Sequence, residues 1–163
     1  MGWHLAQINI GRLVAPVDDP QVADFMAGLD AINALAEASP GFVWRLQTPE
    51  GNATALRVSP DERVIVNMSV WDSIEALAEF AYRTGHVDFL RRRREWFERY
   101  GSAHLALWWL PAGELPDVAE GLERLDTLAT HGPTRAAFTF REPFSPPGSD
   151  AALIADERDA CPA

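Results

Sequence analysis

The alternation of hydrophobic and polar positions along the chain predicts five β-strands. In each of them, apolar side chains recur with a period of two or β-branched and aromatic residues predominate, as expected of strands that cover a core. The predicted strands are residues 4–10, 42–47, 64–71, 104–110 and 136–141.

Between the strands, apolar residues recur at helical spacing and predict helices. The first helix opens at Asp19-Pro20, which supply an N-cap and a proline in the first turn. The next opens at Asp72-Ser73, and Gly85 breaks or bends it. The predicted helical segments run from Pro20 to the SPG sequence at 39–41, from Ser73 to Gly85, over 86–100 and over 115–132.

The order of these elements is βαββαβ, followed by one more helix and strand. This is the order of a ferredoxin-like α+β domain, which we place at residues 1–141. Residues 142–163 contain proline, glycine, serine and acidic residues, and we expect a disordered tail there. The helices of a ferredoxin-like sheet cover one face, so the other face needs a further cover, often a second subunit.

One face of the predicted sheet combines polar and aromatic side chains. The opposite side of the strand 64–71 is uniformly apolar, and we expect it to pack on the helices. That apolar set is Val64, Val66, Met68 and Val70. The mixed face is expected to hold Gln7, Asn9, Arg45, Asn67, Ser69 and Trp71, with His104 and Trp108 as neighbours. Such a face suits a concave small-molecule site, and a dimer interface or a solvated face are the alternatives.

The composition excludes several classes of function. The net charge of −10 argues against a general nucleic-acid binder, which carries a basic surface. No apolar run reaches the ~20 residues of a membrane helix, and the first residues lack the features of a signal peptide, so we expect a cytoplasmic protein. The single cysteine, Cys161, excludes an intrachain disulfide, and the four histidines lack the spacing of a metal site.

The sequence TGHVDFLRRRREWF at 84–97 contains four consecutive arginines. In a helix, most of them lie on a solvated face beside glutamates, and only Arg93 joins the inner stripe. That stripe also holds His86, Phe89 and Trp96. A partly buried arginine needs a carboxylate, a carbonyl or an anionic ligand. His86 is a candidate acid or base, because imidazole exchanges a proton near neutral pH, and a hydrogen-bonded histidine at a helix start is the alternative.

The chain resembles an uncharacterised bacterial family of dimeric α/β-barrel domains, most clearly in WHLAQINIGRL, VNMSVWDSIEALAEFAYRTGHVDFLRRRREWF and ALWWLPAGELPDVAEGLERL. The resemblance covers about residues 3–141, and the family is similar to the antibiotic biosynthesis monooxygenase group. It implies a homodimer of ferredoxin-like protomers, each with a pocket between sheet and helices. The activities of the group are cofactor-independent oxygenation of quinols and anthrones, haem degradation, and cyclase or isomerase reactions.

The resemblance also implies an alternative that involves haem. Haem-degrading members of the group use an asparagine on the first strand, a tryptophan at the end of the third and a haem-ligating histidine on the second helix. Here Asn9, Trp71 and His86 lie in comparable elements. His86 follows the tryptophan more closely than that ligand does. We therefore expect no bound cofactor, with a haem-binding or haem-dependent enzyme as the alternative.

The function expected from the resemblance and the mixed face is a cofactor-independent monooxygenase, or a related cyclase or isomerase, acting on a small aromatic or polyketide-like molecule. Asn9, Asn67 and Trp71 are expected to orient the substrate and stabilise an enolate or phenolate. His86 is expected to take the proton. The expected substrate-binding residues are Arg45, Ser69, Phe89, Arg93, Trp96, His104 and Trp108. A non-catalytic ligand-binding or assembly module is the other alternative.

Overall fold

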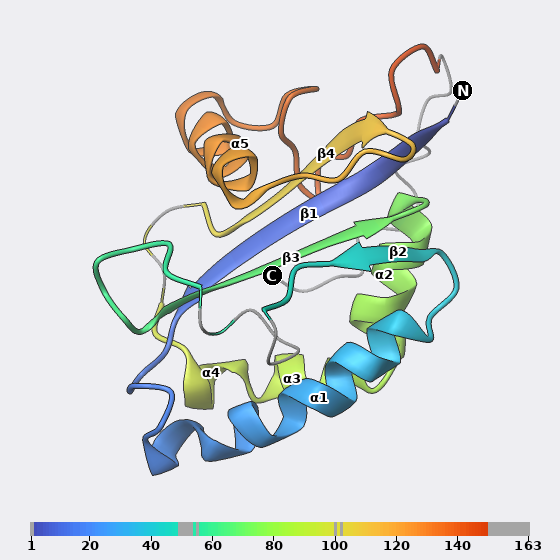
Figure 1. Cartoon of the computed structure of the whole chain (residues 1–163). Helices are drawn as coiled ribbons and strands as arrows, with labels where there is room; N and C mark the ends of the chain where they lie inside the picture. The colour runs from blue at the N-terminus through green and yellow to red at the C-terminus, as the bar shows by residue number, and fades with distance from the viewer. Residues whose placement is uncertain (1, 49–53, 55, 100, 102, 150–163) are drawn as a thin grey trace.

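The computed structural model describes residues 2–48, 54, 56–99, 101 and 103–149 (Figure 1). Its strands are β1 (Trp3–Arg12), β2 (Phe42–Arg45), β3 (Val64–Trp71) and β4 (Leu105–Pro111). Its helices are η1 (Pro20–Val22), α1 (Ala23–Glu37), α2 (Ile74–Arg83), α3 (His86–Arg91), α4 (Arg93–Trp96) and α5 (Val118–His131). Within these described residues, no helix has both the length and the apolar character needed to cross a membrane.

The four strands form one antiparallel sheet in the order β2-β3-β1-β4 (Figure 1). The two strands that α1 connects are therefore separated by β3. This is the strand order of the ferredoxin-like α+β fold, which confirms the fold class predicted from the order of elements. The register places Gln7 opposite Ser69 and Asn9 opposite Asn67, so these four side chains lie on the same face.

The predicted helix starts are confirmed by the side chains that cap them. Asp19 accepts a hydrogen bond from the amide of Gln21 at 2.8 Å, where η1 leads into α1. Ser73 accepts from the amide of Ala76 at 3.1 Å and so caps α2. These oxygens satisfy backbone donors that have no partner within the helix, which is why such residues fix where a helix begins.

The arginine-rich segment is two short helices rather than the single helix predicted over 86–100. After α4 the chain runs beside the end of β1. The amide of Val14 donates to the carbonyl of Trp96 at 2.8 Å, and the amide of Glu98 donates to the carbonyl of Arg12 at 2.8 Å. These bonds to β1 replace the helical bonds of the last predicted turn. The prediction of one helix was wrong because the competing hydrogen bonds come from residues far away in the sequence.

The outer side of this segment is ion-paired, as predicted, although with other partners. Arg92 lies 2.9 Å from Asp24 of α1 and also pairs with Glu95. Arg91 lies 3.5 Å from Asp88. These are exposed pairs, which contribute little to stability individually. The arginine run is therefore a charged surface that also links α4 to α1.

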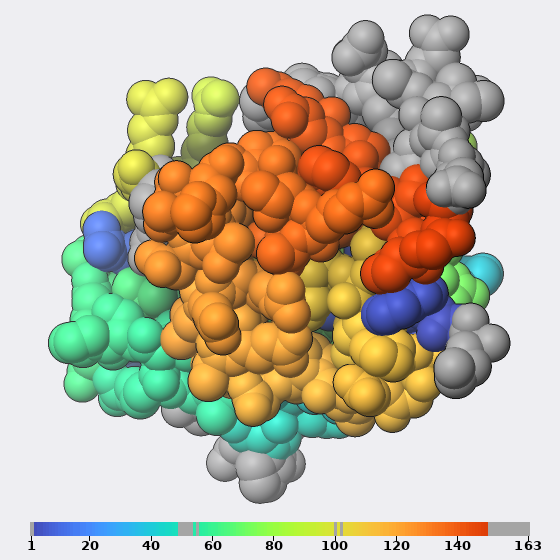
Figure 2. Space-filling model, turned by 90° about the horizontal axis from the view of Figure 1, so that it is seen from above, coloured from blue at the N-terminus to red at the C-terminus, as the bar shows by residue number. Residues whose placement is uncertain are grey.

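Both faces of the sheet are covered by helices of the same chain. α1, α2 and α3 lie on one side and α5 on the other (Figure 1), and Figure 2 shows α5 and the segment after it spread over their face. Val66, Met68 and Val70 are buried with Leu125 and Leu128 of α5. These residues were expected to pack on the helices, and the helix that they contact is α5 rather than α1 or α2. The added helix α5 supplies an apolar cover of its own, so the mixed face is the one that meets α1 and α2.

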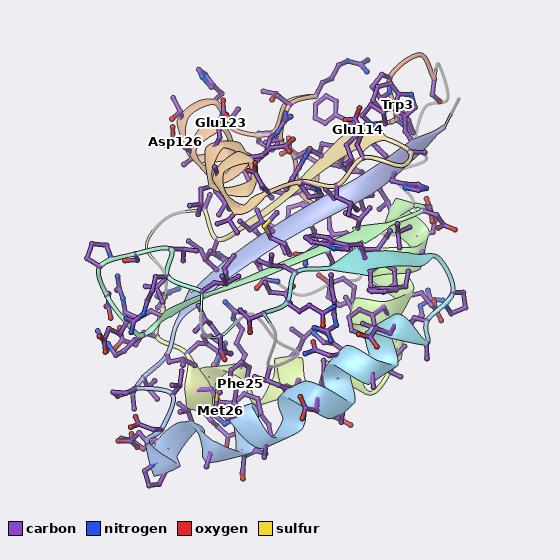
Figure 3. The ribbon with its side chains drawn as sticks, viewed as in Figure 1. Trp3, Phe25, Met26, Glu114, Glu123 and Asp126 are labelled. Atoms are coloured by element: carbon purple, nitrogen blue, oxygen red, sulfur yellow. The ribbon has the colours of Figure 1, made fainter. Side chains whose placement is uncertain are left out.

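α5 fits closely on the sheet at Gly121. A Cβ atom at this position would lie 2.7 Å from Ile8 Cδ1 and 3.1 Å from Met68 Cε, so a larger residue would force the helix away. On the other side of α5, the exposed Glu123 and Asp126 point away from the sheet (Figure 3). Within the described residues, the uncovered sheet face from which a dimer was expected is thus occupied by α5.

The two sides of β4 are the reverse of those predicted. Its register with β1 places Leu107 opposite Gln7, so the odd-numbered residues join the mixed face. Trp108 lies on the α5 side, where its Nε1 donates to Glu120 Oε1 at 3.1 Å. His104 is exposed and precedes the strand. The predicted places of His104 and Trp108 were wrong because alternation cannot tell which side faces which layer when both sides are largely apolar.

The segment predicted as a last strand, 136–141, forms a single bridge to β4 rather than a strand. Leu107 and Phe138 exchange backbone hydrogen bonds of 2.9 and 2.8 Å. The chain then leaves the sheet edge, and the ring of Phe144 packs 5.8 Å from that of Phe138. These aromatic rings are packed together where further backbone pairing with β4 was expected. The rest of the predicted tail, 150–163, lies outside the described residues.

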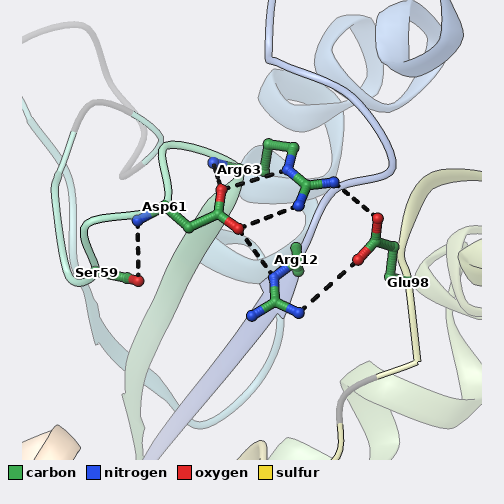
Figure 4. Close-up of polar contacts among 5 residues, drawn as sticks. All are labelled: Arg12, Ser59, Asp61, Arg63 and Glu98. Carbon is green, nitrogen blue, oxygen red and sulfur yellow. Dashed lines mark hydrogen bonds and ion pairs between the residues drawn. The ribbon is translucent and has the colours of Figure 1, made fainter.

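A cluster of two arginines and two acids joins the end of β1, the loop before β3 and the chain after α4 (Figure 4). Asp61 lies 3.1 Å from Arg12 and 3.2 Å from Arg63, and Glu98 lies 2.7 Å from Arg63. Hydrogen bonds from the backbone and side chain of Arg63 hold the pKa of Asp61 below its ordinary value. The two acids in turn raise the pKa of Arg63.

Candidate functional site

Four polar side chains of β1 and β3 form one hydrogen-bonded group, which we call the amide network. Gln7 Nε2 donates to Asn67 Oδ1 at 2.6 Å and to Ser69 Oγ at 2.9 Å. Asn9 Nδ2 donates to Gln7 Oε1 at 3.3 Å and to Asn67 Oδ1 at 3.4 Å. The structure thus brings together Asn9, Asn67 and Ser69, three of the predicted site residues.

The amide network extends from a buried base to an open end. Gln7 is 4% exposed and Ser69 is 7% exposed. Asn9 is half-buried, and Asn67 is exposed. Buried polar groups need hydrogen-bond partners, and the network supplies them at its base. A ligand would therefore meet the network at its Asn67 end.

Trp71 is connected to the amide network but is itself buried. Its Nε1 donates to Ser69 Oγ at 2.9 Å, and the side chain is completely inaccessible to solvent. The ring of Phe80 stacks on the indole at 5.2 Å, and Phe42 meets it edge-on at 5.4 Å. In this structure Trp71 orients Ser69 instead of contacting a ligand directly.

His86 is held in one tautomer at the start of α3. Its Nδ1 lies 3.0 Å from the carbonyl oxygen of Ala81, which can only accept, so Nδ1 carries the proton and Nε2 has the free lone pair. Burial lowers the pKa of His86 below its ordinary value, so the ring is neutral at pH 7. The neutral ring with an unprotonated Nε2 is the form that a general base requires.

The aromatic ring of Phe80 separates His86 from Trp71. Phe80 lies between the two, with its ring 4.8 Å from that of His86 and 5.2 Å from that of Trp71. A porphyrin held by His86 and facing Trp71 would have to occupy the place of Phe80. The residues present therefore do not fit the haem arrangement that the resemblance suggested.

Phe89 and Trp96, two predicted substrate-binding residues, belong to an apolar cluster between α1, α3 and α4. Their rings lie 5.2 Å apart, and Phe25 of α1 packs 5.5 Å from Trp96. Trp96 is only 2% exposed. A Cβ atom on Gly28 would lie 2.0 Å from Phe89 Cζ, so α1 and α3 are in close contact there. These two side chains hold the helices together.

Arg93 is half-buried and has no acidic partner within the described residues. Its guanidinium lies over the ring of Phe97 at 5.2 Å. Burial lowers the pKa of Arg93, and no carboxylate offsets it. Phe97 in turn covers Gly11, where a Cβ would lie 2.6 Å from Phe97 Cδ1. Arg93 is thus held beside Phe97, which covers the end of β1.

Arg45, another predicted binding residue, already has a partner. It lies opposite Ser69 in the register of β2 and β3, and its Nε donates to Glu37 Oε1 at 2.7 Å. Its side chain is 11% exposed, whereas that of Glu37 is 47% exposed. Arg45 thus connects the sheet to the end of α1 at the border of the mixed face.

A concavity of about 350 Å³ lies outside the ring of Phe80, between the loop after α1 and one face of α2. Asp72, Glu75 and Glu79 give it an acidic rim, and Thr84 lies at its end. It shares Phe80 with the aromatic stack but none of the residues of the amide network. The pattern of hydrophobic and polar positions did not predict this concavity.

Two residues of the site were missed as functional candidates. Gln7 was placed on the mixed face but given no role, although a buried glutamine between two polar positions of the facing strand needs their hydrogen bonds. Phe80 was overlooked, although its spacing of three from Leu77 puts it on the inner stripe of α2. Both signals were present in the sequence.

The chain is similar to solved structures of small α+β proteins. A cofactor-independent oxygenase from Streptomyces nogalater, SnoaB, is 17% identical with a TM-score of 0.46, covering 70% of this chain and 98% of its own. Rv0793 from Mycobacterium tuberculosis is 20% identical with a TM-score of 0.46, covering 71% and 98%. A monooxygenase from the gene ActVA-Orf6 of Streptomyces coelicolor, solved with the ligand nanaomycin D, is 15% identical with a TM-score of 0.41, covering 70% and 91%.

A family model matches a longer part of the chain than the solved structures do. The family described as Domain of unknown function (DUF3291) matches residues 4–154. No curated protein matches the chain. The match includes all the strands and helices described above except Trp3, the first residue of β1, and it agrees with the uncharacterised family suggested by the sequence.

Proposed function

This chain belongs to the DUF3291 family, and we propose that it is a monooxygenase-like enzyme that oxidises a small phenolic or enolic molecule without a bound cofactor. The observation that supports this proposal is the amide network, a row of hydrogen-bonding groups with a buried base and an exposed end at Asn67. Fixed donors of this kind stabilise negative charge that develops on a substrate oxygen.

The reaction we propose begins with loss of a proton from the substrate. The Nε2 atom of His86 takes the proton, and the negative charge left on the substrate oxygen is stabilised by the side-chain amide of Asn67. In an anthrone, the methylene carbon then loses its two hydrogens and gains one oxygen atom of O₂ as a carbonyl, while the other oxygen atom leaves as water. The methylene carbon supplies all four electrons, so no external reductant is needed.

The experiment uses dithranol, a dihydroxyanthrone, as the probe. Oxygen consumption and anthraquinone formation are measured together, and we expect one O₂ consumed for each quinone formed. His86→Ala should lower kcat by about 100-fold, the usual contribution of a general base. Arg91→Ala is the control, because that side chain is 75% exposed on the same helix. Equal rates for wild type and His86→Ala would remove His86 from the mechanism, and no turnover above the buffer rate would refute the proposed activity.

A second function, non-catalytic binding, is favoured by one observation. Phe80 fills the space between His86 and Trp71, so the base and the buried end of the network do not meet at one open point. A module that only binds an aromatic molecule at Asn67 does not need His86 and the amide network to contact the same ligand. Binding of dithranol, followed by titration of tryptophan fluorescence, without any oxygen consumption would support this function instead.

A further inference from the structure

Gln7 is the central member of the amide network, and it lies where no ligand reaches it. It occupies the middle of β1, opposite Ser69 of β3 and Leu107 of β4. Its side chain is 4% exposed. Both hydrogens of its Nε2 are used, one by Asn67 Oδ1 at 2.6 Å and one by Ser69 Oγ at 2.9 Å.

These bonds determine which atoms of the neighbouring side chains remain for a ligand. Asn67 Oδ1 accepts from Gln7 and from Asn9, so the nitrogen of the Asn67 amide is the part without a partner in the described residues. Ser69 Oγ accepts from Gln7 and from Trp71 Nε1, so both of its lone pairs are used and its own hydrogen remains to donate. The open end of the network, at Asn67, therefore presents an amide donor, as the stabilisation of an oxyanion requires.

We propose that Gln7 is a positioning residue that fixes the amide of Asn67 with its nitrogen outward. This inference rests on the proposed function, because it assigns the outward nitrogen to the substrate oxygen. The two ends of an asparagine amide are nearly equal in size, so shape alone does not hold one orientation. The donor from Gln7 to Asn67 Oδ1 supplies the preference. Gln7 acts through Asn67 and does not touch the substrate itself.

Replacement of Gln7 by glutamate reverses this preference without changing the shape of the side chain. An ionised carboxylate only accepts, so it faces Asn67 Oδ1 unfavourably and turns the Asn67 amide until its nitrogen points inward. The outward atom is then an oxygen, which repels the substrate oxyanion. Protonation of the introduced carboxyl restores a donor, and its burial places its pKa above the ordinary glutamate value. Gln7→Met has a similar volume and makes no hydrogen bond at any pH.

The kinetic test compares each variant with wild type at the same pH, using dithranol. We expect Gln7→Glu to lower kcat by about 100-fold at pH 8 with little change in KM, as for the loss of one oxyanion donor. The ratio of the variant rate to the wild-type rate should rise as the pH falls, whereas the Gln7→Met ratio should stay low and constant. The titratable groups on this side of the sheet include His86 beside Phe80, Arg45 with its partner Glu37, and Arg93 beside Phe97, and wild type has all of them.

A second measurement does not depend on turnover. Hydrogen exchange of the Asn67 side-chain amide, followed by NMR, should be fast in wild type and slow in Gln7→Glu at pH 8, where that amide donates to the carboxylate. A protected Asn67 amide in wild type, or a Gln7→Glu rate ratio that does not change with pH, would overturn the positioning role. If wild type does not oxidise dithranol, the proposed function fails, and the exchange measurement alone decides the role of Gln7.

Discussion

At the scale of single residues, Ser69 connects the two parts of the site. Its hydroxyl oxygen accepts one hydrogen bond from Trp71 Nε1 and one from Gln7 Nε2, both at 2.9 Å. All three groups are buried. A donor left without a partner in such a place costs more free energy than the hydrogen bond itself contributes. The hydroxyl is thus needed for stability as well as for the arrangement of donors.

Ser69→Ala should lower the free energy of unfolding by about 1–3 kcal/mol, because it leaves the Trp71 donor buried without an acceptor. Urea unfolding measures this change. The control is Ser59→Ala, since Ser59 Oγ accepts a single bond, 3.2 Å long, from the amide of Asp61. We expect a change of less than about 1 kcal/mol there. Equal losses in the two variants would contradict the special role of Ser69.

His86 gives a prediction about pH. Its pKa lies below the ordinary imidazole value of 6.5 because burial penalises the charged ring. A base must be unprotonated, so kcat/KM for dithranol should be constant around pH 7 and fall only in acid, with a midpoint below pH 6.5. The rate is measured from pH 5 to pH 8 after subtraction of the buffer reaction. A midpoint above the ordinary imidazole value would show that another group controls the reaction.

At the scale of elements, local patterns predicted the start of helices and the order of strands but not every boundary. Capping side chains such as Ser73 act on their own helix, so the sequence alone contains the signal. The end of α4 is different, because it depends on bonds from Trp96 and Glu98 to β1. Such contacts join distant parts of the chain, and helical spacing carries no information about them.

The candidate site was predictable to a similar extent. Asn9 and Asn67 were placed on one face by alternation, because their immediate neighbours in β1 and β3 are apolar. Trp108 was assigned to the wrong face, because both sides of β4 are largely apolar and the pattern does not show which side faces α5. The separation of His86 from Trp71 by Phe80 also needed the structure, since it arises from packing between α2 and β3.

The contact between α5 and the sheet should not tolerate a larger residue at position 121. Gly121→Val would bring a side chain against Ile8 and Met68 and displace α5. We expect the exposed apolar face to associate, so the variant should sediment as larger species at micromolar concentration. The control is Ala119→Val, because Ala119 is exposed on the same helix. A variant that stays the same size and equally stable would contradict the close fit.

At the scale of the whole molecule, the charged cluster around Asp61 should affect stability in acid. The pKa of Asp61 is lowered in the folded state, so its stabilising effect is present above the ordinary value of 3.8 and is lost as the pH falls through the lowered value. Asp61→Asn should therefore be less stable than wild type at pH 7 and nearly equal to it in strong acid. Thermal unfolding across this pH range tests the prediction, and a constant difference between the two proteins would refute it.

The position of α5 changes the expected state of association. A barrel of two sheets needs an open apolar face, and in this structure α5 covers that face within one chain (Figure 1). Wild-type protein should therefore sediment as a single monomer boundary at micromolar concentration. A stable dimer at this concentration would mean either that another surface pairs or that α5 moves away, and Gly121→Val would distinguish the two.

When the cover of the sheet belongs to the same chain, the stability of the fold does not depend on protein concentration. When a second molecule closes the sheet, dilution separates the halves and the melting temperature depends on concentration. Here closure is intramolecular, so the melting temperature should be the same from nanomolar to micromolar protein. A monomer has no second site to couple with, so saturation by a ligand should be hyperbolic.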